Sequence, residues 1–466
     1  MAIRFYNTYS RQQEEFHPLD PAGREVRMYT CGPTVYHYAH IGNFRAYVFE
    51  DLLQRHLESR GYEVNRVMNL TDVDDKTIRG CRAAGLPLGG FTRQYKTAFF
   101  DDLQTLRVKP AGAYPAATDP EQIGRMIGMI STLMENGAAY QAEDGSVYFR
   151  LSHFPDYGKL ARLNLEELRP SGRIRNDEYE KESIGDFALW KAWSEADGDV
   201  GWESPWGRGR PGWHIECSAM ATGLLGPQLD IHCGGVDNIF PHHEAEIAQS
   251  ECCTGKPFVR YWMHCAHLMV EGQKMSKSLG NFYTLRDLLD QGWSGREIRY
   301  ALISVHYRLP LNFTFEGLAA ARSALGRIDE WVARISAHAG DAAATDCPAL
   351  AQARFEEALD HDLNISGALG HLFDLIRETN RLLDQGSLSP GEARAVALWW
   401  QRVDATLQLG RGEEATPQAV LDLVEARQAA RQAKEWAESD RLRTEIDALG
   451  WVVKDTREGP KLSRKG

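Results

Sequence analysis

At 466 residues the chain is too long for one ordinary domain and suits two to four. Its hydrophobic content of 43% can build real cores, and no run of about 18 apolar residues is present that would span a membrane. The formal net charge of −12 argues mildly against nucleic-acid binding, which usually needs a basic surface. Residues 422–466 nevertheless hold ten Lys or Arg and nine Asp or Glu, so local RNA contacts stay compatible with the composition.

The eight cysteines include no C-x2-C pair, and the first residues resemble neither a secretory leader nor a transit peptide. Reduced thiols in a cytoplasmic protein are therefore expected, without membrane association. The sequence contains no heptad repeat of apolar residues that would predict oligomerisation, so a monomer is expected.

The first elements along the chain predict a parallel α/β unit. Residues 26–31 read as a short strand that ends in the turn Gly32-Pro33-Thr34. Apolar residues from Phe44 to Leu57 follow helical spacing, and Gly61 stands where a C-terminal cap belongs. A second strand is expected at 64–70. In such sheets ligands bind beyond the carboxyl ends of the strands.

The middle of the chain predicts an insertion and then a second α/β half. Residues 111–205 are rich in Pro, Gly and charge, with helical stretches near 119–138. Residues 229–232 read as a strand, Gly234-Gly235 as a turn, and 241–250 as a helix with Pro near its start.

After Phe282 the pattern becomes helical. Segments 316–336, 351–384 and 391–409 are amphipathic and rich in Ala and Leu, which predicts an antiparallel helical bundle. Residues 410–417 read as a linker to a small module at 418–466. The expected divisions are a first α/β half at 1–110, a connective insertion at 111–205, a second α/β half at 206–290, a junction at 291–315, the bundle at 316–410 and a C-terminal module at 411–466.

Two segments suggest phosphate chemistry. Lys274-Met-Ser-Lys-Ser278 puts two ammonium groups three residues apart between Gly272 and Gly280, and such a loop can neutralise charge as pyrophosphate leaves. Alone, it would more often be a solvated loop. The second segment, His40-Ile-Gly-Asn43, begins the first long helix, whose N-terminal N–H groups suit phosphate.

Each residue of that second segment has a possible role. Gly42 lets a nucleotide approach the backbone, and His40 can donate to a phosphate oxygen. The alternative is that His40 only packs or caps the helix. The presence of both segments in one chain favours the functional interpretation.

A metal site is suggested by His242 and Glu246, which lie four residues apart on a predicted helix and can grip one ion. His243 lies about 100° round that helix and is not expected to join them. Cys217 and Cys31 are candidate further ligands, and two thiolates, an imidazole and a carboxylate suit Zn²⁺. Spacing alone leaves other cysteines in competition as ligands: Cys233, Cys252, Cys253 and Cys265.

Six segments, in order and over essentially the whole chain, resemble the cysteinyl-tRNA synthetases of the class I aminoacyl-tRNA synthetase family. The His40–Asn43 and Lys274–Ser278 segments are similar to its HIGH and KMSKS signatures. The six are Cys31–Tyr36, His40–Asn43, Asn69–Lys76, Gly212–Met220, Phe240–Glu244 and Lys274–Asn281. The implied fold is a Rossmann-like parallel-sheet catalytic domain split by an insertion, followed by an α-helical bundle and a small C-terminal module.

The resemblance implies activation of L-cysteine with ATP and Mg²⁺, release of pyrophosphate and transfer of cysteine to the 3′ end of tRNA(Cys). It assigns Zn²⁺ to Cys31, Cys217, His242 and Glu246. A soft metal can bind the substrate's thiolate in preference to a serine hydroxyl. A site that demands a specific polar bond can discriminate by roughly 10⁴–10⁵, so no editing is needed.

Other roles follow from the same resemblance. The expected catalytic residues are His40, Asn43, Lys274 and Lys277, with Lys277 as the main phosphate contact of its loop; the expected ATP contacts are His40, Gly42, Asn43, Gly235, Asp237 and Lys277; and the expected cysteine contacts are Cys31, Thr71, Trp213 and His232. Without the family, Thr71 would read as a turn hydroxyl, Trp213 as a core aromatic and His232 as a strand-end histidine. Asp74-Asp75 could be a Mg²⁺ pair, but a solvated acidic turn is favoured.

The chain departs from the family pattern in two places. Asn43 replaces the second histidine of the HIGH name, a common variant that can still donate a hydrogen bond. The tail at 455–466 lacks the usual Gly-Thr and aromatic, which leaves its anticodon contacts open. Trp436 and Trp451, with Arg427, Arg431, Arg441 and Arg443, could contact RNA, although core packing is favoured for both tryptophans.

Three rival functions share parts of this pattern. A cysteine ligase that acts on an amino sugar would share the adenylation and zinc chemistry but lack the complete C-terminal region. A non-catalytic RNA-binding paralogue would typically lose the loop lysines or the zinc ligands. A purely structural zinc is disfavoured because three of the four ligands flank the expected nucleotide crevice.

Overall fold

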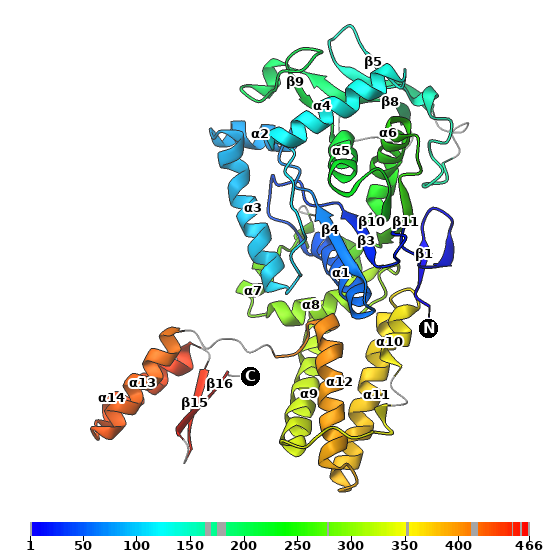
Figure 1. The fold of residues 1–466 in the computed structure, drawn as a ribbon. Helices are drawn as coiled ribbons and strands as arrows, with labels where there is room; N and C mark the ends of the chain where they lie inside the picture. Colours follow the sequence, from blue (N-terminus) through cyan, green and yellow to red (C-terminus); the bar gives the residue numbers. More distant parts are fainter. Residues whose placement is uncertain are drawn as a thin grey trace. The chain divides into compact units, whose positions relative to one another are not determined.

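The computed structural model describes residues 2–163, 169–174, 183–276, 279–350, 354–411, 418–449, 451–456 and 459–464. The chain forms two compact units, Met1–Leu409 and Gly410–Gly466. Figure 1 shows the first unit as a sheet region between an insertion and a helical bundle. The α/β fold class expected from the sequence is confirmed.

The centre of the first unit is a four-stranded parallel sheet in the order β11-β10-β3-β4. Its strands are β3 (Glu25–Thr30), β4 (Glu63–Met68), β10 (Leu229–Gly235) and β11 (Val259–Cys265). Alternate side chains enter cores on opposite faces: Met28 packs with Phe49 and Leu53 of helix α1, whereas Tyr29 packs with Met220 on the other face.

Helix α1 (Ile41–Ser59) connects β3 to β4, and Gly61 follows its end at a φ of +91°. β10 runs through the Gly234-Gly235 pair, which was expected to be a turn. Helix α5 (Trp213–Leu225) precedes β10. Helix α6 (Glu244–Thr254) follows it and begins later than expected, because Ile239–His243 form a wider π-helical turn.

The insertion extends from this sheet. Helices α2 (Asp75–Ala84), α3 (Leu88–Thr105) and α4 (Pro120–Glu135) lead into it. Its strands are β5 (Ala139–Gln141), β6 (Val147–Phe149), β7 (Arg169–Ile174), β8 (Ser183–Ala192) and β9 (Gly209–Pro211). Strands β5, β6, β8 and β9 pair antiparallel, and β7 pairs parallel with β8. Its apolar core includes residues of α4 and α5, which fixes the insertion above the sheet.

A short sheet carries the lysine segment. It consists of β12 (Leu268–Val270), β13 (Gln273–Lys274) and β14 (Leu311–Phe313), with helices α7 (Leu285–Asp290) and α8 (Gly295–Ile303) between its last two strands. The N-terminal hairpin of β1 (Arg4–Asn7) and β2 (Gln12–Glu15) was not predicted.

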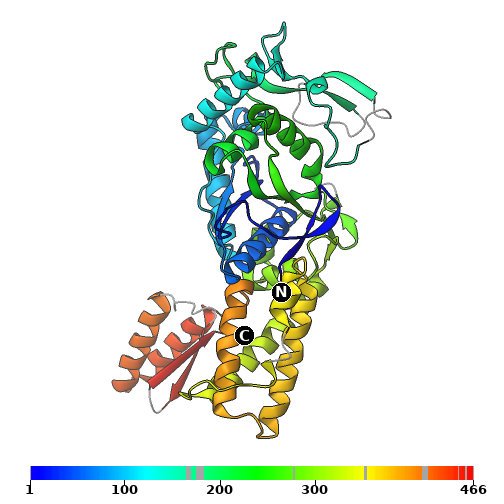
Figure 2. The same ribbon diagram turned by 45° about the vertical axis from the view of Figure 1, so that its right-hand side comes forward.

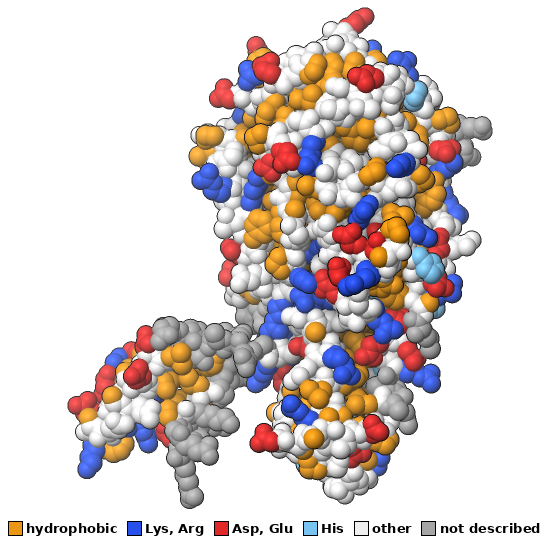
Figure 3. Space-filling model, viewed as in Figure 1, with side chains coloured by type: hydrophobic (Ala, Val, Ile, Leu, Met, Phe, Trp, Pro, Cys, Tyr) orange, Lys and Arg blue, Asp and Glu red, His pale blue; other side chains and the backbone are white. Residues whose placement is uncertain are grey.

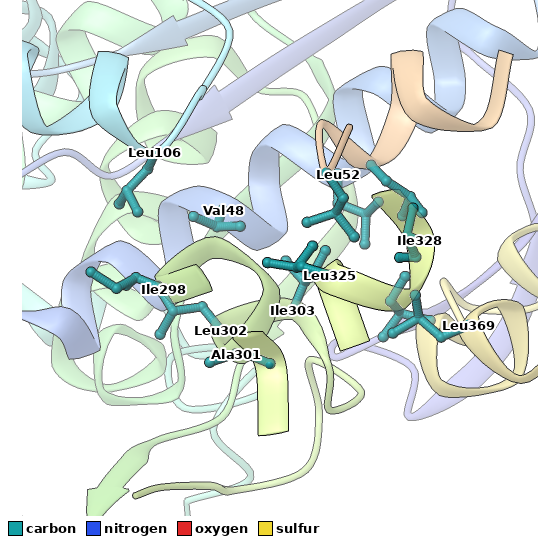
Figure 4. Packing of buried hydrophobic residues seen from close by; sticks show 14 of the residues in the cluster. Val48, Leu52, Leu106, Ile298, Ala301, Leu302, Ile303, Leu325, Ile328 and Leu369 are labelled. Atoms are coloured by element: carbon teal, nitrogen blue, oxygen red, sulfur yellow. The ribbon is translucent and has the colours of Figure 1, made fainter. Parts of the chain in front are cut away.

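The bundle contains α9 (Phe315–Ala339), α10 (Phe355–Asp360), α11 (Ile365–Asp384) and α12 (Pro390–Leu407). The amphipathic segment at 351–384 contains two helices, because residues 361–364 separate α10 from α11. One apolar core continues from α1 through α8 into the bundle, and Figure 4 shows Leu52, Ile303 and Leu325 meeting there. Figure 2 shows the long bundle helices side by side.

The second unit contains α13 (Gln418–Gln432), α14 (Trp436–Ala448) and the antiparallel pair β15 (Trp451–Thr456) and β16 (Gly459–Arg464). Val420, Ile446 and Val453 belong to its core. Most of the expected linker at 410–417 lies outside the described residues. Over the described part of the chain, no helix is long and apolar enough to cross a bilayer.

Candidate functional site

The candidate site lies at the carboxyl ends of β3 and β10, where open parallel sheets bind ligands. Cys31 follows β3 directly, and its N–H donates to the carbonyl of Cys233 in β10 (3.3 Å). Gly32 packs tightly against the loop after β4: a Cβ at this position would lie 1.7 Å from the carbonyl oxygen of Asn69. The close approach holds the loops after β3 and β4 together.

The atoms that could hold a metal converge beside Cys31. The ligand atoms of Cys31, Cys217, His242 and Glu246 all lie within 4.8 Å of one another. His242 Nε2 lies 3.3 Å from Cys217 Sγ and 3.1 Å from Glu246 Oε1, and Cys31 Sγ lies 4.0 Å from the same oxygen. Two thiols, an imidazole and a carboxylate form a donor set suited to Zn²⁺.

A second four-residue set overlaps the first. Cys31, His232, His243 and Glu246 also have ligand atoms within 4.8 Å of one another, and His243 Nε2 lies 3.4 Å from Cys31 Sγ. His243 was not expected to join His242 and Glu246, and it does not belong to the set that contains His242. It shares Cys31 and Glu246 with that set, and both histidines lie in the wider turn before α6.

Buried partners hold these histidines. His242 Nδ1 lies 2.9 Å from His214 Nδ1, and the indole of Trp213 stacks on the His242 ring at 4.3 Å. Burial lowers the pKa of His242 to about 3, so the ring is neutral, the state in which imidazole binds metals. The pKa of the Cys31 thiol is raised well above its usual value, first by its contact with Cys217 and then by burial.

His243 has its own series of partners. Its Nδ1 lies 2.8 Å from His264 Nε2, and His264 Nδ1 lies 2.8 Å from the hydroxyl of Thr8. Sequence reasoning missed His214, His243 and His264 as members of the site. His214 and His243 stand beside predicted site residues, so adjacency was a usable signal, but nothing local marks His264.

The three further residues expected to contact cysteine lie around the cluster. The Thr71 hydroxyl donates to Glu216 Oε2 (2.8 Å) and is buried. His232 is fully buried, with Nε2 2.9 Å from Glu246 Oε2. Trp213 is half-buried and stacks on His242 as described. All three thus contact either the cluster or a buried carboxylate beside it.

The His40–Asn43 segment forms a capped helix start. His40 is the N-cap of α1: its Nδ1 accepts the Asn43 N–H (3.2 Å), and Asn43 Oδ1 accepts the His40 N–H (3.1 Å). The Ile41 N–H donates to the Tyr283 carbonyl (3.0 Å). Two of the N–H groups expected for phosphate are therefore already used. A neutral ring that accepts at Nδ1 carries its hydrogen on Nε2, where it can donate.

The lysine loop lies next to this helix start. A Cβ on Gly42 would lie 3.3 Å from Cε of Met275. Asn281 bridges the loop, because Oδ1 accepts the Ser276 N–H (2.8 Å) and Nδ2 donates to the Lys274 carbonyl (3.2 Å). Lys274 is exposed, and Lys277 lies outside the described residues.

The expected adenine and ribose contacts follow β10. A Cβ on Gly235 would lie 2.3 Å from Asp237 Oδ1, so no larger residue fits there without a shift. Asp237 is exposed.

The interpretation of Asp74-Asp75 as a solvated acidic turn is wrong. Asp74 is buried and caps α2 by accepting the Thr77 N–H (2.6 Å). Asp75 pairs with Lys191 and Arg210 of the insertion, which lower the pKa of its carboxyl against the opposing effect of burial. These residues line a cavity of about 550 Å³ that reaches Trp213.

The remaining cysteines and tryptophans are also placed. Cys233 and Cys265 are buried, and Cys252 and Cys253 are half-buried; among the described residues none of them belongs to either metal set. Trp451 packs in the core of the second unit, as expected, but Trp436 is 58% exposed, contrary to expectation.

Three of the expected RNA-contacting arginines already have partners. Arg427 makes a bidentate ion pair with Asp455, and the Arg431 guanidinium lies 5.9 Å from the Trp436 ring centroid. Arg441 pairs with Glu438 and Glu445, neighbours on α14. Figure 3 shows basic and acidic side chains mixed over one face of the chain.

Comparisons with known families cover nearly the whole chain. Residues 16–323 match the family described as tRNA synthetases class I (C) catalytic domain. Residues 354–405 match a DALR domain, and 413–459 match a cysteinyl-tRNA ligase anticodon binding domain.

Individual relatives agree. The cysteine–tRNA ligase of Chlamydia muridarum is 51% identical over all of both chains, and that of Protochlamydia amoebophila is 50% identical over 99% of this chain and 98% of its own. Among solved structures, Mycobacterium tuberculosis methionyl-tRNA synthetase with methionyl-adenylate has a TM-score of 0.60 at 14% identity, covering 83% of this chain and 88% of that one. An Agrobacterium radiobacter LeuRS–tRNA–LeuAMS complex has a TM-score of 0.60 at 12% identity, covering 84% and 85%. The two structures are similar in fold.

Proposed function

The chain belongs to the cysteine–tRNA ligases of the class I aminoacyl-tRNA synthetase family, and on that premise we propose how its residues divide the work. The reaction joins L-cysteine to AMP with release of pyrophosphate and then transfers cysteine to the 3′ end of tRNA(Cys). The observation that carries the proposal is the convergence of Cys31, Cys217, His242 and Glu246 at the strand ends, close to the start of α1.

In this proposal those four residues hold a Zn²⁺ ion. Bound there, the ion would supply a soft position for the substrate's thiolate, which a serine hydroxyl fills poorly. His214 holds the His242 ring from its far nitrogen, as metal-bound histidines usually require. Thr71, Trp213 and His232 surround the bound amino acid, with Trp213 covering the His242 ring.

ATP would bind across the start of α1 and the end of β10. His40 would donate from Nε2 to a phosphate oxygen, Gly42 and Asn43 would shape the helix start, and Gly235 and Asp237 would meet adenine and ribose. The cysteine carboxylate then attacks the α-phosphate, so no general base is needed. Lys277 and Lys274, which the sequence motif assigns to the phosphates, would neutralise the departing pyrophosphate.

tRNA would contact the bundle and the second unit. In the second unit, Trp436 and Arg431 offer an exposed aromatic ring beside a guanidinium, a pair suited to a splayed base and its phosphate. In this proposal the 3′ end would enter the cavity beside Trp213, which is lined by Lys191 and Arg210 together with the carboxylates of Asp75 and Asp197. We retain the expectation of a cytoplasmic monomer, which cell fractionation and gel filtration would test.

The amino-sugar ligase is the nearest rival, since it shares the adenylation chemistry. The bundle helices α9, α11 and α12 and the match of residues 413–459 favour tRNA as acceptor. The non-catalytic paralogue is disfavoured by the intact metal set and the two lysines.

The decisive experiment is cysteine-dependent ATP–pyrophosphate exchange followed by charging of purified tRNA(Cys). Cysteine is expected to support exchange and serine is not, and chelation of the metal should remove that difference. Exchange without charging would contradict the tRNA assignment and support the amino-sugar ligase. Exchange with serine as efficient as with cysteine would contradict the recognition role of the cluster.

A further inference from the structure

The segment Asp360-His-Asp-Leu-Asn364, which leads from the last residue of α10 to the N-cap of α11, has an unusual backbone. Asp362 and Leu363 have φ values of +57° and +53°, a region that costs a non-glycine residue on the order of 1 kcal/mol or more. Such a conformation persists only where its surroundings hold it. Asn364 ends the turn by capping α11, where its Oδ1 accepts the Gly367 N–H (3.0 Å).

Asp360 bonds to the last turns of α1. Its side chain is only 2% exposed, with Oδ1 3.1 Å from His56 Nε2 and Oδ2 2.6 Å from Arg60 Nη2. A buried carboxylate with two such partners is held in one geometry, and removal of a partner is costly.

Asp362 bonds to a different set of segments. Its Oδ1 accepts from the Tyr6 N–H (2.9 Å) and the Tyr307 hydroxyl (2.6 Å), and its Oδ2 accepts from Arg308 Nε (2.7 Å). The Tyr307 ring stacks on Phe49 of α1 at 4.4 Å. The two carboxylates thus connect the bundle to the middle and the end of α1.

Helix α1 links this turn to the active site. His40 is its N-cap, Asn43 lies in its first turn, and its 19 residues extend for about 28 Å at 1.5 Å per residue. Accordingly, we propose that Asp360 and Asp362 are positioning residues that hold the bundle in register with α1, so that tRNA on the bundle reaches the active site correctly. This inference rests on the proposed function.

The polar contacts add orientation to an interface that is already apolar. Leu52, Ile303, Leu325 and Leu369 pack where α1, α8, α9 and α11 meet (Figure 4). Apolar packing is non-directional and tolerates small rotations, whereas buried hydrogen-bonded charges accept one arrangement. The two carboxylates are therefore expected to affect tRNA transfer more than cysteine activation.

The test compares two reactions of the full chain. Asp360→Asn should lower kcat/KM for tRNA in charging about tenfold, a coupling of the usual size, while cysteine-dependent exchange stays within about twofold. The matched control is Asp156→Asn, which makes the same change at an exposed ion pair with Lys159, outside the bundle. Both of its reactions should stay within about twofold.

Normal charging by Asp360→Asn, or parallel loss of exchange and charging, would overturn the inference. Should Asp360→Asn fail to fold, Arg60→Gln removes the same contact from a partly exposed side chain and should give the same split. The Asp360→Asn/Arg60→Gln double variant should be no worse than Asp360→Asn; additive losses would contradict a shared contact. Absence of exchange in the unaltered chain would instead refute the proposed function.

Discussion

The candidate metal site, referred to below as the cluster, and the lysine loop are built in opposite ways. The cluster draws on the end of β3, on α5 and on the start of α6; Cys217, His242 and Glu246 are buried, and partners such as His214 and Trp213 fix the rings. In the lysine loop, Gly272 and Gly280 both have positive φ, Lys274 is exposed, and Asn281 Oδ1 accepts the Ser276 N–H. A preformed buried site suits recognition, whereas an exposed lysine in a loop flanked by glycines suits a group that moves with the reaction.

Substitution of Lys277, which is assigned to the loop from the sequence, gives the strongest test of the contrast between the cluster and the loop. Lys277→Ala should lower kcat for cysteine-dependent exchange by roughly 10²–10³, because it removes charge stabilisation in the transition state. The KM for cysteine should change little. Equal losses in kcat and in cysteine binding would contradict the separation of roles.

A substitution in the cluster should instead affect metal binding and the choice of amino acid. Cys217→Ser should weaken zinc binding by at least ~100-fold, since it removes a thiolate ligand, and should erode the preference for cysteine over serine. Metal content by atomic absorption and exchange with both amino acids would measure this. Cys252→Ser is the matched control, because Cys252 lies in α6 outside both metal sets, and it should retain full metal.

The buried region beneath the site should also respond to pH. Burial raises the pKa of Glu50 in α1 to about 8, while Arg66 and Thr30 oppose the rise. The unfolded carboxyl ionises near 4.5, so the folded state holds an extra proton between these values, and stability falls as pH rises through that window. Between pH 6.5 and 9 the loss should be about 2 kcal/mol in urea unfolding. Glu50→Gln should remove this slope, and an unchanged slope would assign it to other groups.

The two regions also differ in what the sequence could predict. The spacing of His242 and Glu246 indicates that both reach one point, because four residues make about one helical turn, and their side chains lie 3.1 Å apart. The approach of His243 to Cys31 and Glu246 was not predicted, since the π-helical turn Ile239–His243 is not visible in periodicity. Contacts such as Asp360 with His56 join segments some 300 residues apart, and no local pattern encodes them.

The smallest expected effect concerns the bridge across the loop. Asn281→Ala removes the contacts to the Ser276 N–H and the Lys274 carbonyl, so the loop should spend less time in its active arrangement. We expect kcat for exchange to fall about fivefold, at the low end of the cost of two lost hydrogen bonds because one of them is exposed, with KM for cysteine and zinc content unchanged. Asn312→Ala is the matched control: Asn312 Oδ1 also accepts a backbone N–H, that of Gly272, but at the outer turn of the hairpin. Equal losses in the two variants would mean that general order in the hairpin matters and the bridge itself does not.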